Sequence, residues 1–141
     1  SLASTPPDAE IRQMGAAFER DWDSLQQPPP DECGGRRFVV FSFGSNIFGL
    51  GAQLHYLSLV ASYAFHTNRT LIAAPQDTWW YASASDCPSR SLECYLMPLS
   101  TCTASNAHTP HSGPTVFASL SPQDPSLFSS TRETARVVFT G

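Results

Sequence analysis

Hydrophobic positions along the chain follow helical spacing in two segments and form strand-like runs in three others. Residues 9–26 carry an apolar stripe at spacings of three and four, which predicts an amphipathic helix. The stripe consists of Ile11, Met14, Phe18, Trp22 and Leu25. Asp8 can cap the start of this helix, and the prolines at 28–30 end it. We expect the stripe to be a packing face.

The following segment predicts a strand–loop–helix–strand unit. Residues 37–43 are β-branched and aromatic on both faces, as in a buried strand of a parallel sheet. A turn begins at 44–46, and a helix is expected over 53–66, before a second strand at 70–74. The side of this helix that is expected to face the sheet comprises Leu54, Leu57, Ala61 and Ala64, widened by Val60 and Phe65. Asn68 is suited to end the helix in a left-handed conformation, and the two strands should pair in parallel.

Beyond residue 75 the pattern weakens. Residues 83–94 predict a loop, and residues 103–130, rich in Ser, Thr, Pro and His, predict a surface excursion. Residues 136–140 predict a third short strand, and the end of the chain directly after it suggests a cut-off sequence. The expected fold class is α/β, with a partial open parallel sheet and a loop-rich C-terminal segment. We divide it into a lead-in with a helix (1–32) and a first α/β subdomain, truncated (33–141).

The amino-acid composition and net charge argue against some classes of binding partner. The chain has 141 residues and a net charge of −4, and all eight basic residues are Arg, without a basic run. Nucleic-acid binding by charge is therefore not expected. No apolar stretch approaches the roughly 20 residues of a membrane span. Any membrane attachment would need an anchor outside this chain.

Four cysteines occur, at positions 33, 87, 94 and 102, in a spacing that matches no zinc pattern. An even number of cysteines in a chain rich in Pro and Ser fits disulfides in an oxidising compartment. Four cysteines allow three connectivities. Cys87 and Cys94 bracket a short segment and are natural partners, which leaves Cys33 with Cys102. The alternative is four free thiols in a cytosolic protein.

The loop Gly49-Leu50-Gly51-Ala52-Gln53 stands between a predicted strand and a helix N-terminus. Free backbone N–H groups and the positive end of the helix dipole converge at such a place, which suits an anion. The loop is neither the full dinucleotide fingerprint nor a phosphate-binding P-loop. A glycine-lined turn without a ligand is the equal alternative. His55, on the first helical turn, either faces a ligand or packs beneath the loop.

Other polar residues give weaker signals. Arg69 at the helix–strand junction can reach a phosphate, but a structural pairing is favoured. Asn68-Arg69-Thr70 is an N-glycosylation sequon at a tight junction, where occupancy is doubtful. The histidines lack a ligand pattern, so no metal site is expected. No nucleophile–base arrangement can be identified, and the catalytic residues remain unknown.

Four short motifs follow one another in an order that resembles the core α1,6-fucosyltransferase family (glycosyltransferase family 23-like), in the N-terminal part of its catalytic region. They are Gly51-Ala52-Gln53-Leu54-His55, Asn68-Arg69-Thr70-Leu71-Ile72, Trp80-Tyr81-Ala82 and Pro98-Leu99-Ser100-Thr101-Cys102. Leu25-Gln26, followed by Pro28, and Cys33 also look like that family's helix exit and first disulfide cysteine. The resemblance covers roughly residues 10–102.

The resemblance implies a GT-B-like architecture, with the donor GDP-fucose between two open α/β domains. It implies an inverting enzyme of the Golgi or secretory lumen that needs no metal ion or other cofactor. Its acceptor would be the innermost GlcNAc of N-glycans. Carried over, the donor-proximal residues are Gly49, Gly51, Ala52 and Gln53, with His55 as a further candidate. A Cys33–Cys102 disulfide is implied as well.

The chain departs from the family in three places. Position 52 is Ala where that family's loop often carries cysteine, and the segment between Cys87 and Cys94 is an insertion. The family's downstream His-x-Arg-Arg segment is absent, so this polypeptide alone is expected to be inactive. Two alternatives remain: a relative of protein O-fucosyltransferases, or a non-catalytic secreted, disulfide-bonded module. The second would bind glycans through Trp79, Trp80 and Tyr81.

Overall fold

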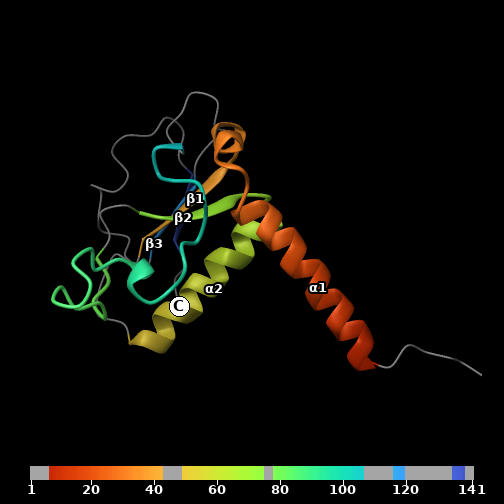
Figure 1. Ribbon diagram of the computed structural model, residues 1–141, viewed down its shortest axis with the longest axis horizontal. Helices are drawn as coiled ribbons and strands as arrows, with labels where there is room; N and C mark the ends of the chain where they lie inside the picture. Colours follow the sequence, from red (N-terminus) through yellow and green to blue (C-terminus); the bar gives the residue numbers. More distant parts are fainter. Residues whose placement is uncertain (1–6, 43–48, 75–77, 107–115, 120–134, 139–141) are drawn as a thin grey trace, which may run out of the picture.

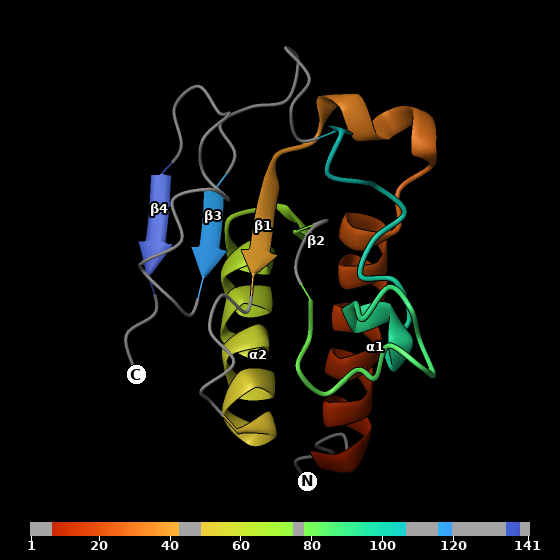
Figure 2. The same ribbon diagram turned by 90° about the vertical axis from the view of Figure 1, so that its left-hand side faces the viewer.

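The computed structural model describes residues 7–42, 49–74, 78–106, 116–119 and 135–138. The elements are α1 (Pro7–Gln26), η1 (Pro30–Gly35), β1 (Phe38–Ser42), α2 (Leu50–His66), β2 (Thr70–Ala73), η2 (Leu92–Cys94), β3 (Val116–Ser119) and β4 (Ala135–Val138). The four strands form one sheet in the order β2-β1-β3-β4, and every pairing is parallel. The expected α/β class with a parallel sheet is thus confirmed. Helix α2 runs along the sheet, and α1 projects away from it (Figures 1 and 2).

Strand β1 is buried along its whole length because it separates two apolar clusters. Side chains of a strand alternate between faces, so odd and even positions enter different clusters. Val39 and Phe41 pack with Val60 and Ala64 of α2. Phe38 and Val40 pack on the other face with Cys33, Cys102 and Ile72. Helix α2 therefore covers one face of the sheet, and the two segments joined by the Cys33–Cys102 disulfide cover the other.

Two buried polar contacts fasten the C-terminal end of α1 to the edge strand β2. The hydroxyl Oγ1 of Thr70 donates to the carbonyl of Leu25 at 2.9 Å. The backbone N–H of Leu71 donates to Oε1 of Gln26 at 3.0 Å. The open edge of a sheet otherwise leaves backbone groups unpaired. Gln26 thus closes part of this edge.

The helix boundaries and inner faces differ in part from the prediction. Helix α2 begins at Leu50, three residues before the predicted start, and Asn68 follows it with a φ of 52°, as expected. The prediction that Leu54 lies on the side of the helix that faces the sheet is wrong, because its side chain is 41% exposed. Gln53 takes the buried place instead, together with Val60 and Ala64. A hydrogen bond from Trp79, described below, holds the Gln53 side chain in this buried place.

The expectation of an irregular excursion over 103–130 is wrong for its middle. Strand β3 lies inside this range and pairs with β1, with Val40 opposite Phe117. Four residues give too short an alternation to stand out in the sequence. Strand β3 forms because its backbone pairs in parallel with that of β1. The predicted third strand is β4, at Ala135–Val138, while the predicted turn at 44–46 lies outside the described residues.

Two disulfides link the four cysteines, Cys33 with Cys102 and Cys87 with Cys94. The pairing argued from the sequence is therefore confirmed, and the alternative of four free thiols is wrong. Disulfides of this kind indicate an oxidising environment, secreted or lumenal. Among the described helices, none is long and apolar enough to cross a membrane.

Candidate functional site

The first turn of α2 follows β1 in the chain and presents backbone N–H groups without a side-chain cap. Gly49 is the N-cap residue, and its carbonyl accepts a hydrogen bond from the N–H of Gln53 at 3.1 Å. No side chain caps this end, and the first turn contains no acidic residue. The first N–H groups of a helix have no partner within the helix, and the helix dipole is positive there. The local arrangement therefore favours an anion.

The place of this turn in the order of elements supports an anion site. Because all strands are parallel, the carboxyl ends of β1, β2, β3 and β4 lie along one edge, and α2 begins after the end of β1. The chain passes from β1 through α2 to β2 on one side, while β3 pairs with the other side of β1. Ligands of open parallel sheets bind at the carboxyl edge where the strand order reverses in this way. The Gly49 turn follows β1 in the chain, on the carboxyl side of that strand.

Four of the five residues predicted to contact the donor are accessible here. Gly49, Gly51, Ala52 and His55 are exposed. A Cβ atom added at Gly49 or Gly51 would meet no atom within 4 Å. These glycines are therefore not required by packing, and they leave the backbone open to close approach by a ligand.

The fifth predicted residue, Gln53, is held inside the protein. Its side chain is fully buried, and its Oε1 accepts a hydrogen bond from the indole Nε1–H of Trp79 at 2.6 Å. The buried Gln53 side chain thus anchors the first turn of α2 to Trp79. The sequence carried a signal for this, because Gln53 stands seven residues before Val60, on the same side of the helix.

Arg69 and Asn68 lie at the opposite end of α2. A helix of 17 residues is about 25 Å long, which separates them from the Gly49 turn. The Arg69 guanidinium donates from Nη1 to the carbonyl of Phe38 at 3.4 Å, and burial lowers its pKa. The structural role favoured for Arg69 is confirmed. Of the sequon, Asn68 is exposed, whereas Thr70 is fully buried.

An aromatic group flanks the buried Trp79. The rings of Tyr81 and Tyr95 pack edge-on against the Trp79 ring, with centroids 5.8 Å and 5.9 Å away. Trp80 is 63% exposed and Tyr95 61%, whereas Trp79 is only 4% exposed. The expectation that Trp79 itself forms part of a glycan-stacking platform is therefore wrong. Its indole is used in the interior.

The Cys87–Cys94 loop holds this aromatic group in place. The N–H of Trp79 donates to the carbonyl of Arg90 at 2.6 Å. The guanidinium Nε of Arg90 donates back to the carbonyl of Ala82 at 3.0 Å. The segment closed by the Cys87–Cys94 disulfide therefore folds back against residues 79–82.

The described part of the chain contains no cluster of three or more His, Cys, Asp or Glu side chains suited to a metal ion. Its distinctive features are an open helix N-terminus, which suits an anion, and the exposed aromatic side chains of Trp80 and Tyr95. Comparisons with protein-family models, curated proteins and solved structures give no significant match.

Proposed function

We propose that this chain is the N-terminal part of the catalytic region of a fucosyltransferase that uses GDP-fucose, and that the Gly49 turn holds the donor's diphosphate. The single observation that carries the proposal is the exposed, uncapped N-terminus of α2, which follows β1 of a parallel sheet. Diphosphates bind at such helix ends in other α/β proteins. The ordered motifs of the sequence supply the donor's identity.

In the proposed reaction, an acceptor hydroxyl attacks the anomeric carbon of fucose while the bond to the β-phosphate breaks. GDP leaves, and a general base takes the acceptor proton. Backbone N–H groups of Gly51 and Ala52 would stabilise the negative charge that develops on the leaving diphosphate. The base and the second wall of the donor cleft would come from downstream sequence, in a GT-B-like arrangement. The acceptor would be the core GlcNAc of an N-glycan in the Golgi lumen.

Calorimetry with GDP, GDP-fucose and UDP tests this proposal, on the protein extended past Gly141 by its natural downstream sequence. We expect both guanosine ligands to bind at least about tenfold more tightly than UDP. A preference for UDP would overturn the fucosyl assignment. A downstream sequence without a paired-arginine segment would contradict the family assignment.

A second candidate function is a secreted glycan-binding module. It is favoured by the exposure of Trp80 and Tyr95, because aromatic faces stack on sugar rings. Ligand-observed NMR with N-glycan oligosaccharides and the isolated chain separates the two functions. Binding that is lost in Trp80→Ala and indifferent to GDP would support the module. Retention of all glycan binding in that variant would rule it out.

A further inference from the structure

The apolar stripe of α1 is covered only at its C-terminal end. Leu25 is 7% exposed, whereas Phe18 is 50%, Ile11 65% and Met14 72% exposed. Figure 1 shows why: α1 approaches the sheet at its C-terminal end and diverges from α2 toward its N-terminus. The sequence predicts that the stripe is a packing face, and within the described residues its N-terminal half, with Ile11 and Met14, is left exposed. A contiguous apolar stripe in water marks an interaction surface.

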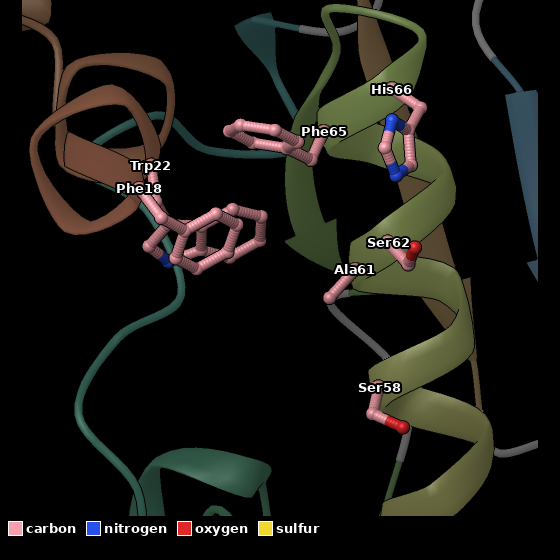
Figure 3. A pocket seen from close by; sticks show the side chains of 7 residues that line it. All are labelled: Phe18, Trp22, Ser58, Ala61, Ser62, Phe65 and His66. Carbon is pink, nitrogen blue, oxygen red and sulfur yellow. The ribbon is translucent and has the colours of Figure 1, made fainter. Parts of the chain in front are cut away.

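Helix α2 adds a second wall to this surface. A groove of about 500 Å³ lies between the two helices, lined by Phe18 and Trp22 of α1 and by Ser58, Ala61, Ser62 and Phe65 of α2, among others. The ring of Phe65 packs at 4.9 Å from that of Phe18 and closes one end (Figure 3). The α2 wall elsewhere carries the small side chains of Ser58, Ala61 and Ser62 (Figure 3). Small residues on one wall leave room for large apolar side chains of an incoming segment.

Carboxylates line both edges of the α1 stripe. Asp8 and Glu19 lie three residues before Ile11 and Trp22, which places them on one edge. Glu10 and Asp21 lie four residues before Met14 and Leu25, which places them on the other edge. All four are exposed, and within the described residues none of them forms an ion pair. Arg12 lies outside the first edge, and Arg20 lies opposite the stripe.

The acidic edges of the α1 stripe distinguish between two possible binding partners, a second copy of this chain and a different polypeptide. If two copies of α1 met through their stripes, carboxylates would face carboxylates in either orientation, because both edges are acidic. Like charges across a helix–helix seam destabilise the pairing, and opposite charges favour it. A partner helix whose apolar stripe is flanked by cationic side chains would instead place opposite charges along both edges of the α1 stripe.

We propose that the α1 stripe and the α1–α2 groove dock an amphipathic helix of a partner polypeptide, with an apolar stripe flanked by Lys and Arg. The surface from Ile11 to Trp22 is about 17 Å long, so the partner helix needs about three turns. Large apolar side chains of the partner would enter the groove, as in helix-in-groove recognition. This proposal does not depend on the fucosyltransferase assignment.

Two synthetic helical peptides of the same leucine pattern provide the test, one flanked by Lys and Arg and the other by Glu. Fluorescence anisotropy measures their binding to the disulfide-intact chain. We expect the basic peptide to bind at least about tenfold more tightly, with an affinity that falls as salt rises. Equal affinity of the two peptides would overturn the proposal.

Matched variants locate the binding surface. Met14→Asp should weaken the basic peptide about tenfold or more, whereas Gln13→Asp, on the far side of the same helix, should not. The double change Glu10→Lys and Glu19→Lys should shift the preference to the acidic peptide, which a misfolded protein would not do. Sedimentation showing a dimer of the chain that Met14→Asp dissolves would overturn the proposal in favour of a second copy.

Discussion

The indole Nε1–H of Trp79 donates a hydrogen bond to Oε1 of Gln53 across 2.6 Å, and both side chains are buried. This contact joins residues 26 positions apart in the sequence. It fixes the first turn of α2, which is the proposed diphosphate site, against the aromatic group around Trp79. The residue that anchors the proposed site, Trp79, therefore lies in a segment that is distant in the sequence from the glycine loop.

Trp79→Phe should destabilise the protein by about 2–3 kcal/mol, because it removes a donor to a buried oxygen and leaves a small void. Urea unfolding of the oxidised chain measures the change. The control is Trp80→Phe, since Trp80 is 63% exposed and should change stability by no more than about 0.5 kcal/mol. Equal effects of the two substitutions would contradict the structural role of Trp79.

Gln26→Met should cost about 1–3 kcal/mol, because the buried N–H of Leu71 loses its acceptor at the edge of the sheet. Gln27→Met is the matched control. Gln27 is exposed, and its longer bonds of 3.4 Å to two carbonyls should contribute little. Hydrogen exchange at the amide of Leu71 provides a local readout. An unchanged exchange rate in Gln26→Met would count against the edge contact.

The two disulfides should differ in their contribution to stability. Cys33 and Cys102 are separated by 69 positions, and Cys87 and Cys94 by 7. The loss of loop entropy in the unfolded chain is then worth about 4 kcal/mol for the first and about 2.5 kcal/mol for the second. Thermal unfolding of two double variants, Cys33→Ala with Cys102→Ala and Cys87→Ala with Cys94→Ala, tests this order. The first double variant should show the larger drop in Tm.

Accessibility predicts the order of reduction as well. Cys33 is 1% exposed and Cys102 5%, whereas Cys87 and Cys94 are both half-buried. Mild reductant followed by alkylation should therefore label the Cys87–Cys94 pair first, as read by mass spectrometry. First labelling of Cys33 and Cys102 would contradict the buried position of that disulfide.

Gly51→Val should weaken GDP binding by the downstream-extended protein about tenfold or more, since the side chain obstructs the backbone approach to a diphosphate. No atom lies within 4 Å of a Cβ at this position, so the fold should be unaffected. Gly15→Val, in α1, has the same open surroundings and serves as the control. Calorimetry measures both variants. Undiminished GDP binding by a folded Gly51→Val protein would argue against the turn as the diphosphate site.

The central unit of the fold could be predicted from local pattern. Residues 38–41 are apolar on both faces of the buried strand, and α2 follows with helical spacing. Asn68 marks the end of the helix because it tolerates a positive φ. In each of these cases the residues that carry the signal lie within a few positions of one another.

Local sequence patterns were enough to predict the α/β class, the β1–α2–β2 unit and the location of the glycine turn, and they favoured the disulfide pairing that the structure has. Only the tertiary packing places β3 beside β1, because four residues form a strand only where a neighbouring strand pairs with them. It also decided that Gln53 and Trp79 bond inside the protein, since neither residue type indicates its distant partner. The same applies to the exposed half of the α1 stripe. Helical spacing predicts an apolar face, but only the packing of the whole chain shows which part of that face remains uncovered.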